Sequence, residues 1–350
     1  PGDSIRYIDI EHGADANDGR TKATPWQHHP WAPAATERAA SAKGIHTYVF
    51  RRGVAYRGQL LASESGRPGD PICLTSDPSW GQGDAELLGS ESVTGWKLGA
   101  DHPDIPDSSR VAYVDLKFAP RNVWLVKNDG RVIRIPLART PNWTVSDPDD
   151  VKSEWWSWDN PKSPWGSREK LNGQEVHLAI DTKHIKGPAE YFEGAYIWPE
   201  YGWVMSTPYP TRVLKCDPQR HALLFGGQWG GPAGSYHIPR HARYYLEDKP
   251  QYLDSPGEFW FDSKRGGGRL YLRLPTGENL NEVRIEVAKY LNLIDSQQMS
   301  HVHISGLTFR FTNVLWDLGA PPTRGNDVDP ACVRLLGSGQ DIVIANCRFE

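Results

Sequence analysis

The acidic residues between Thr312 and Pro330 are the first candidates for chemistry in this sequence. Asp317, Asp327 and Asp329 lie in this segment beside Trp316, and the segment lengthens an otherwise regular strand pattern. Cleavage of a glycosidic bond needs two carboxyl groups, one to protonate the leaving oxygen and one to act as nucleophile or to activate water. We therefore expect catalytic roles for these aspartates and a substrate contact for Trp316. A solvated acidic loop with Asp-Pro turns is the alternative.

A basic segment is the second candidate. Tyr236, His237, Arg240 and Arg243 lie close together in a chain whose formal net charge is -4. Arginine forks bind carboxylate and sulfate groups well, so this segment predicts contacts with an anionic polysaccharide. An ordinary charged surface is the alternative.

His303 is the third candidate, because it lies between Val302 and Ile304 in a segment of period-two pattern. Its side chain should therefore point away from the core. There it could line a groove and act as a catalytic base. An exposed strand histidine without a catalytic role is the alternative.

Aromatic residues form the fourth candidate group. They are concentrated between Trp155 and Trp203. Sugar rings present faces of C–H groups that stack on aromatic rings, so we expect Trp198 and Trp203 to bind substrate. The alternative is that these rings pack a domain that lacks a strong aliphatic core.

A turn-rich acidic loop near the N-terminus contains Asp15, Asn17 and Asp18. Oxygen ligands at this spacing could hold a calcium ion, although the loop is shorter than a full twelve-residue calcium loop. Such residues are also ordinary turn formers. We expect no obligatory cofactor or metal, with calcium as the one ion that this loop could bind.

Composition restricts the class of protein. The chain has 350 residues with 34 Gly, 28 Pro, 15 Trp and 14 Tyr but two Met, which is typical of a turn-rich β-protein. No run of Lys or Arg resembles a nucleic-acid tract, and no apolar stretch approaches the roughly 20 residues of a membrane span. The four cysteines form no metal-binding pattern, so we interpret them as small buried hydrophobic residues.

The elements that would position these groups are best defined at the C-terminal end. Val302 and Ile304 are repeated as Ile342 and Ile344, and the group Leu291, Leu293 and Ile294 is repeated as Val333, Leu335 and Leu336. Short strands of period two that repeat with turn residues between them predict stacked coils of a parallel β-solenoid. About three or more coils are needed for stability, so we expect further coils beyond Glu350.

The middle of the chain has a different pattern. An Asn-Asp-Gly turn at 128–130 and a Gly-Gly-Gly turn at 266–268 lie between strand-like segments and predict antiparallel hairpins. We therefore predict an all-β chain with three parts. These are first β-helix coils at 1–95, an inserted antiparallel β-domain at 96–282, and further coils at 283–350.

Several segments resemble those of a known family. "NDGRTKATPW", "YVFRRGVAYRG", "SGRPGDPICLT" and "LLGSESVTGW" are similar to the N-terminal part of secreted right-handed parallel β-helix carbohydrate-active proteins. "IPLARTPN", "LDSPGEFWFD" and "GRLYLRLPTGENLN" resemble segments of glycoside hydrolase family 141 and its relatives. The resemblance implies a right-handed parallel β-helix. It does not identify the substrate, because this scaffold serves hydrolases, lyases and adhesins.

Together these observations predict a secreted or periplasmic enzyme, its leader removed, that hydrolyses a polysaccharide with two carboxylates in a β-helix groove. Two alternatives remain. A polysaccharide lyase would remove a proton beside a uronic carboxylate, using a base such as His303 and the cations Arg240 and Arg243. A non-catalytic glycan-binding adhesin would bind sugar through Trp and Tyr alone.

Overall fold

The computed structural model describes residues 4–202, 210–227, 232–234, 236–313 and 331–350. Within these ranges the chain consists mostly of strands in parallel and antiparallel sheets, which confirms the prediction of a mostly β protein. The short helical elements are α1 (Glu37–Ser41), α2 (Ala189–Phe192) and the 3-10 turns Ser108–Arg110 and Pro250–Tyr252. The candidates Trp203, Trp316, Asp317, Asp327 and Asp329 lie outside the described residues.

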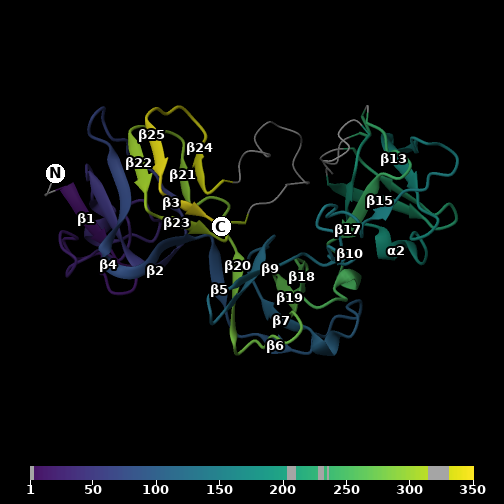
Figure 1. Ribbon diagram of the computed structural model, residues 1–350, viewed down its shortest axis with the longest axis horizontal. Helices are drawn as coiled ribbons and strands as arrows, with labels where there is room; N and C mark the ends of the chain where they lie inside the picture. The colour runs from purple at the N-terminus through teal and green to yellow at the C-terminus, as the bar shows by residue number, and fades with distance from the viewer. Residues whose placement is uncertain (1–3, 203–209, 228–231, 235, 314–330) are drawn as a thin grey trace.

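Parallel strands from both ends of the chain form the part drawn at the left of Figure 1. A seven-stranded sheet contains β1 (Ile5–Ile8), β2 (Thr47–Arg57), β4 (Ile72–Leu88), β22 (Val302–Ser305), β23 (Thr308–Arg310), β25 (Ile342–Ala345) and β26 (Arg348–Phe349). A three-stranded sheet contains β3 (Leu60–Leu61), β21 (Ile294–Ser296) and β24 (Val333–Leu335). Strands 200 residues or more apart in sequence are thus direct neighbours.

We call these two parallel sheets the parallel stack. In its later strands, the observed pairing of residues agrees with the repeat in the sequence. Val302 pairs with Ile342 and Phe309 pairs with Phe349, as predicted. The earlier strands pair differently, because Ile294 lies opposite Val333 rather than Leu336. The predicted register is therefore wrong by three residues at this corner.

The stack buries an apolar row between successive strands. Tyr48, Leu74, Val302, Ile304 and Phe309 are all fully buried in one cluster. Alternation of buried and half-buried positions along β22 explains this, since every second side chain of a strand points inward.

Two antiparallel four-stranded sheets lie in the middle of Figure 1 and pack around a shared apolar core. One contains β6 (Lys97–Leu98), β7 (Ala112–Asp115), β18 (Glu258–Asp262) and β19 (Arg269–Arg273). The other contains β5 (Ser90–Val93), β8 (Val123–Lys127), β9 (Val132–Ile135) and β20 (Val283–Ala288). The hairpins predicted at 128–130 and 266–268 are both present.

Strand β20 corrects one expectation. The sequence predicts that residues 283–287 return the chain to the parallel coils, but β20 pairs antiparallel with both β5 and β8. Its alternating pattern suits either kind of sheet, and its partners are far away in sequence. The predicted boundaries at 95/96 and 282/283 themselves stay a prediction.

An eight-stranded antiparallel sheet forms the part at the right of Figure 1. It contains β10 (Arg139–Thr140), β11 (Trp156–Ser157), β12 (Ser167–Leu171), β13 (Gln174–Ile180), β14 (Tyr196–Pro199), β15 (Thr211–Asp217), β16 (Ala222–Phe225) and β17 (Arg243–Glu247). Its core is aromatic. Trp158 is fully buried and stacks on Tyr244 at 3.7 Å between ring centroids, and Tyr201 is also fully buried.

A buried ion pair connects the parallel stack to the middle sheets. Arg57 of β2 donates to both carboxylate oxygens of Glu286 of β20, at 2.7 and 2.8 Å. Ser90 Oγ donates to the same carboxylate at 2.6 Å, and Arg284 Nε lies 2.7 Å from it. The Glu286 side chain is fully buried, so this network holds the two parts of the fold together.

The N-terminal acidic loop makes internal contacts. Asp15 is 6% exposed, and its carboxylate accepts hydrogen bonds from His28 and Thr36. Asn17 and Asp18 make side-chain hydrogen bonds within the same turn. The described residues contain no group of three His, Cys, Asp or Glu side chains arranged to hold a metal ion. These contacts give the loop a structural role, and calcium binding here stays a prediction.

The four cysteines are free thiols, of which Cys216 is buried and the other three are half-buried. No helix in the described ranges has the length and apolarity that a membrane span requires.

Candidate functional site

One face of the eight-stranded sheet collects aromatic and charged side chains. Along β17, Tyr244 and Leu246 point into the core, so Tyr245 and Glu247 lie on the opposite face. Trp198 of β14 pairs with Tyr245, and Arg139 of β10 pairs with Glu247. We name as the aromatic face the side chains of Arg139, Trp143, Trp155, Trp198, Tyr245 and Glu247.

The rings of the aromatic face are in contact. Trp198 and Tyr245 are nearly parallel, with centroids 5.8 Å apart, and Trp155 meets Tyr245 edge-on at 4.6 Å. Trp155 and Trp198 are half-buried, and Trp143 is 54% exposed. The face therefore presents rigid ring surfaces that a sugar could stack on.

Arg139 lies beneath these rings. Its guanidinium carbon is 3.6 Å from the centroid of Tyr245, 4.9 Å from that of Trp143 and 5.5 Å from that of Trp155. The side chain is 3% exposed, and in the described part of the chain it forms no ion pair with a carboxylate. Burial lowers the pKa of Arg139, although an arginine stays charged in proteins. The rings thus stabilise this cation through cation–π contacts.

Glu247 is the carboxyl group of the aromatic face. Trp198 Nε1 donates to its Oε1 at 2.8 Å. Burial raises the pKa of Glu247, and the hydrogen bond from Trp198 and the charge of Arg139 oppose this only in part. A raised pKa is a property that a general acid needs, and Glu247 has it beside the rings of the aromatic face.

Asp248 lies next to Glu247 and contacts two arginines. Arg121 Nη1 and Arg212 Nη1 are 3.8 and 3.5 Å from its Oδ2. Both guanidinium groups also contact the ring of Tyr196. Burial raises the pKa of Asp248, and the two arginines counteract that effect. Its negative charge further raises the pKa of Glu247.

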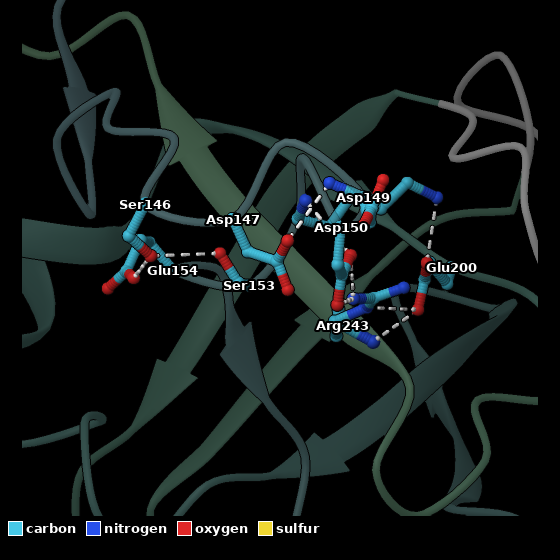
Figure 2. A network of polar contacts seen from close by, with 9 residues as sticks. Ser146, Asp147, Asp149, Asp150, Ser153, Glu154, Glu200 and Arg243 are labelled. Atoms are coloured by element: carbon cyan, nitrogen blue, oxygen red, sulfur yellow. Dashed lines mark hydrogen bonds and ion pairs between the residues drawn. The ribbon is translucent and has the colours of Figure 1, made fainter.

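Arg243 lies on the same face, and its side chain is paired with carboxylates, as Figure 2 shows. Its Nη1 donates to both oxygens of Asp150 at 2.7 and 2.6 Å, and its backbone N–H donates to Glu200 at 2.8 Å. Lys152 forms a second ion pair with Glu200 at 2.8 Å. These contacts hold the segment that leads into Trp155, so the role of Arg243 is to position that segment. A direct contact with substrate stays a prediction.

The other residues of the basic segment lie elsewhere. Arg240 donates to the backbone oxygen of Asn160 at 2.9 Å. His237 faces Trp165 with 6.0 Å between ring centroids, and Tyr236 packs against the buried Tyr201. The structure therefore does not bring Tyr236, His237 and Arg240 together with Arg243 in one cation cluster.

His303 points outward from the parallel sheet, as predicted, since both of its strand neighbours are buried. Its Nε2 lies 3.7 Å from Asp341 Oδ1, while His301 Nδ1 lies 2.9 Å from Asp341 Oδ2. The hydrogen bond from His301 lowers the pKa of Asp341. His303 belongs to the parallel stack, and the aromatic face belongs to the eight-stranded sheet at the other side of Figure 1. A catalytic role for His303 stays a prediction.

Comparison with known proteins bears on the fold. No protein-family model matches the chain, and the comparison with curated proteins found no match. A solved structure titled "Glycoside hydrolase" is similar over 88% of this chain with a TM-score of 0.55 and 16% identity. This chain is similar in fold to a glycoside hydrolase. It spans 51% of that protein, about half its length, and at this identity the likeness concerns the fold alone.

A second structure, titled "The complex structure of XylC with xylose", is similar over 94% of this chain and 38% of its own length. Its identity is 10% and its TM-score is 0.41. A similarity of this size carries no argument about function.

Sequence reasoning named Trp198 and Arg243, whose roles stay predictions, and did not name Arg139, Trp143 and Glu247 as site residues. One signal was available, because Arg243, Tyr245 and Glu247 alternate with buried residues in a short strand. Arg139 and Trp143 gave no such signal. They reach the face only because β10 pairs with β17, whose sequence lies about a hundred residues further on.

Replacing Trp143 with alanine should weaken oligosaccharide binding about two- to tenfold, because a ring contact is worth roughly 0.5–1.5 kcal/mol. Stability should change little, since this ring is 54% exposed. Calorimetric titration of the complete protein would measure the change. Trp80→Ala, which removes a half-buried ring of β4 in the parallel stack, is the matched control. Equal weakening in both variants would contradict a role for the aromatic face.

Proposed function

We propose that this chain is part of a carbohydrate-active enzyme that hydrolyses glycosidic bonds. The observation that carries the proposal is the aromatic face, where ring surfaces surround a buried cation and a carboxyl group with a raised pKa. Stacking rings can bind a sugar chain, and a carboxyl with a raised pKa can serve as one of the two carboxyl groups that cleavage requires. The similarity in fold to a glycoside hydrolase is consistent with this activity.

In the proposed reaction Glu247 is the general acid. A sugar ring stacks on Trp143 or Trp155, and the Glu247 carboxyl gives its proton to the glycosidic oxygen as the bond to the anomeric carbon breaks. A second carboxylate attacks that carbon or removes a proton from an attacking water. Asp317, Asp327 and Asp329 are the predicted candidates for this group. A separation of about 5–5.5 Å from the acid would give retention, and about 6.5–9.5 Å would give inversion.

We further propose that the parallel strands wind as a right-handed β-helix. Parallel pairing of β22 with β4 and β25 supports this proposal. Secretion or a periplasmic location would suit a polysaccharide substrate. The grounds for the β-helix and for the secreted or periplasmic location are the repeat in the sequence and the resemblance to secreted β-helix proteins.

Asp317→Asn, Asp327→Asn and Asp329→Asn should leave the protein folded, and at least one of them should lower turnover about tenfold or more. An asparagine cannot act as nucleophile or base, while its size is unchanged. Initial rates on the true substrate and thermal melting would measure the two properties. Full turnover in all three variants would remove this segment from the mechanism.

The activity itself is tested by incubating the complete protein with neutral, uronic and sulfated polysaccharides while reducing ends and ultraviolet absorbance are followed together. Reducing ends without new absorbance are expected of a hydrolase. Reducing ends with absorbance would identify a lyase, because β-elimination leaves a double bond. Binding without new reducing ends would identify a glycan-binding protein and overturn the proposed enzyme.

A further inference from the structure

A cleft of about 1060 Å³ lies beside the edge strands of the two four-stranded sheets. Residues of β5 and β20 line it from one sheet, and residues of β6 and β19 line it from the other. The segment 94–96, which connects β5 to β6, forms part of its wall. Small-ligand sites have volumes of about 300–1,000 Å³, so this cleft has room for several sugar units.

Trp96 provides a fixed ring in the cleft. Its Nε1 donates to the backbone oxygen of Val93 at 2.9 Å, and its ring packs on the core between the two sheets. The side chain is only half-buried, so part of the ring lies open. Leu98, on the adjoining edge strand, is 71% exposed in the same cleft. Together they form an apolar wall that needs no rearrangement to accept the C–H face of a sugar.

Arg273 provides a fixed hydrogen-bond donor. It is 7% exposed, its Nε donates to Leu253 O at 2.7 Å, and its Nη2 donates to Pro106 O. Within the described part of the chain, its Nη1 has no hydrogen-bond partner. The two carbonyl contacts hold the guanidinium plane and leave Nη1 as a donor without a protein partner in the described ranges. A ligand hydroxyl could accept a hydrogen bond from this fixed donor.

The charges of the cleft decide what kind of ligand suits it. Its charged residues are Asp107, Asp254, Glu278, Arg110, Arg273 and Arg284. Acids and bases are equal in number. Four of these side chains already belong to ion pairs, which are Arg110–Asp107, Lys127–Glu278 and Arg284–Glu286. A carboxylated or sulfated ligand would gain no net attraction. Neutral hydroxyl groups can both donate to such acids and accept from such bases.

We propose that this cleft is a second glycan-binding site, separate from the aromatic face, and that it takes a neutral oligosaccharide segment. Trp96 stacks on one sugar ring, and Arg273 Nη1 donates to a hydroxyl oxygen of that ring or its neighbour. The glycan class rests on the proposed function, but the site shares no residue with the aromatic face. Such a site would hold a long chain on the protein while another part of it is cleaved.

The test follows individual tryptophans in the complete protein labelled with 5-fluorotryptophan. The ¹⁹F resonances of Trp96, Trp198 and Trp80 would be assigned with single Trp→Phe variants. Cellohexaose, xylohexaose and hexagalacturonate would be titrated separately. We expect the Trp96 resonance to shift and saturate with a neutral hexasaccharide, while Trp80 stays unchanged. Trp96→Ala and Arg273→Lys should each weaken that binding about two- to tenfold, with melting curves as the check on folding.

The outcomes distinguish the second glycan-binding site from the proposed function of the aromatic face. A shift at Trp198 without one at Trp96, for every sugar tested, would overturn the second site and leave the proposed function standing. A shift at Trp96 without one at Trp198 would support the second site and count against the aromatic face. Saturable binding of hexagalacturonate in preference to both neutral sugars would overturn the assigned ligand class. No shift at Trp96 with any sugar would overturn the inference entirely.

Discussion

Replacing Glu286 with alanine should lower the free energy of unfolding by about 3–5 kcal/mol, the usual loss when one partner of a buried ion pair is removed. Glu286 is fully buried and binds Arg57, Ser90 and Arg284. Without it, the Arg57 guanidinium would lose the carboxylate that accepts its two hydrogen bonds. Urea unfolding at neutral pH would measure the loss.

Glu91→Ala is the matched control for this change. Glu91 lies on β5, which pairs with the strand that carries Glu286, and it binds Lys289 at 2.9 Å with both side chains 36% exposed. An exposed pair is worth about 0–1 kcal/mol. A loss at Glu286 no larger than the loss at Glu91 would contradict a structural role for the buried network.

The same network predicts how stability depends on pH. Burial alone would raise the pKa of Glu286, but hydrogen bonds from Arg57 and Ser90 outweigh it and lower the pKa below the usual value. A lowered pKa in the folded protein means that its contribution is fully present above the unfolded pKa of about 4.3 and is lost as pH falls through the lower folded value. As the pH falls below about 5, the Glu286→Gln variant should therefore lose less stability than the wild type.

Glu247→Gln should lower turnover by about 10²–10⁴-fold, the usual contribution of general acid catalysis. The amide retains an oxygen that accepts the hydrogen bond from Trp198, so stability and KM should change little. Because the pKa of Glu247 is raised, its proton is retained to higher pH, and this group should define the basic limb of the pH–rate profile. Initial rates across a pH series would show that limb vanish in the variant.

Comparing substrates with different leaving groups distinguishes a general acid from a carboxyl that has only a structural role. Aryl glycosides with acidic phenols need no protonation of the leaving oxygen, so the variant should cleave them nearly as fast as the wild type. Glu169→Gln, at a partly exposed carboxylate on β12 of the same sheet, is the control. An equal loss on all substrates would contradict the role of general acid.

Local structure could be predicted from the sequence because its causes are local. Asn128-Asp-Gly130 adopts a tight turn between alternating segments, and Gly130 has a positive φ of 84° that glycine tolerates best. The pairing of Val302 with Ile342 follows from the repeat, because the two copies pair as parallel strands with like residues in register. The mostly β character and the outward direction of His303 follow from the same period-two pattern.

Tertiary structure alone decided which residues share a surface. Trp155 and Trp158 lie in one run, yet Trp155 lies on the aromatic face and Trp158 is in the core, because strand pairing sets the direction of each side chain. Arg243 had no visible partner until the fold placed Asp150 against it, 93 residues away. Strand β20 alternates in a way that suits either kind of sheet, and long-range contacts selected its neighbours. Residues distant in sequence meet only through such contacts, and single-residue patterns do not encode them.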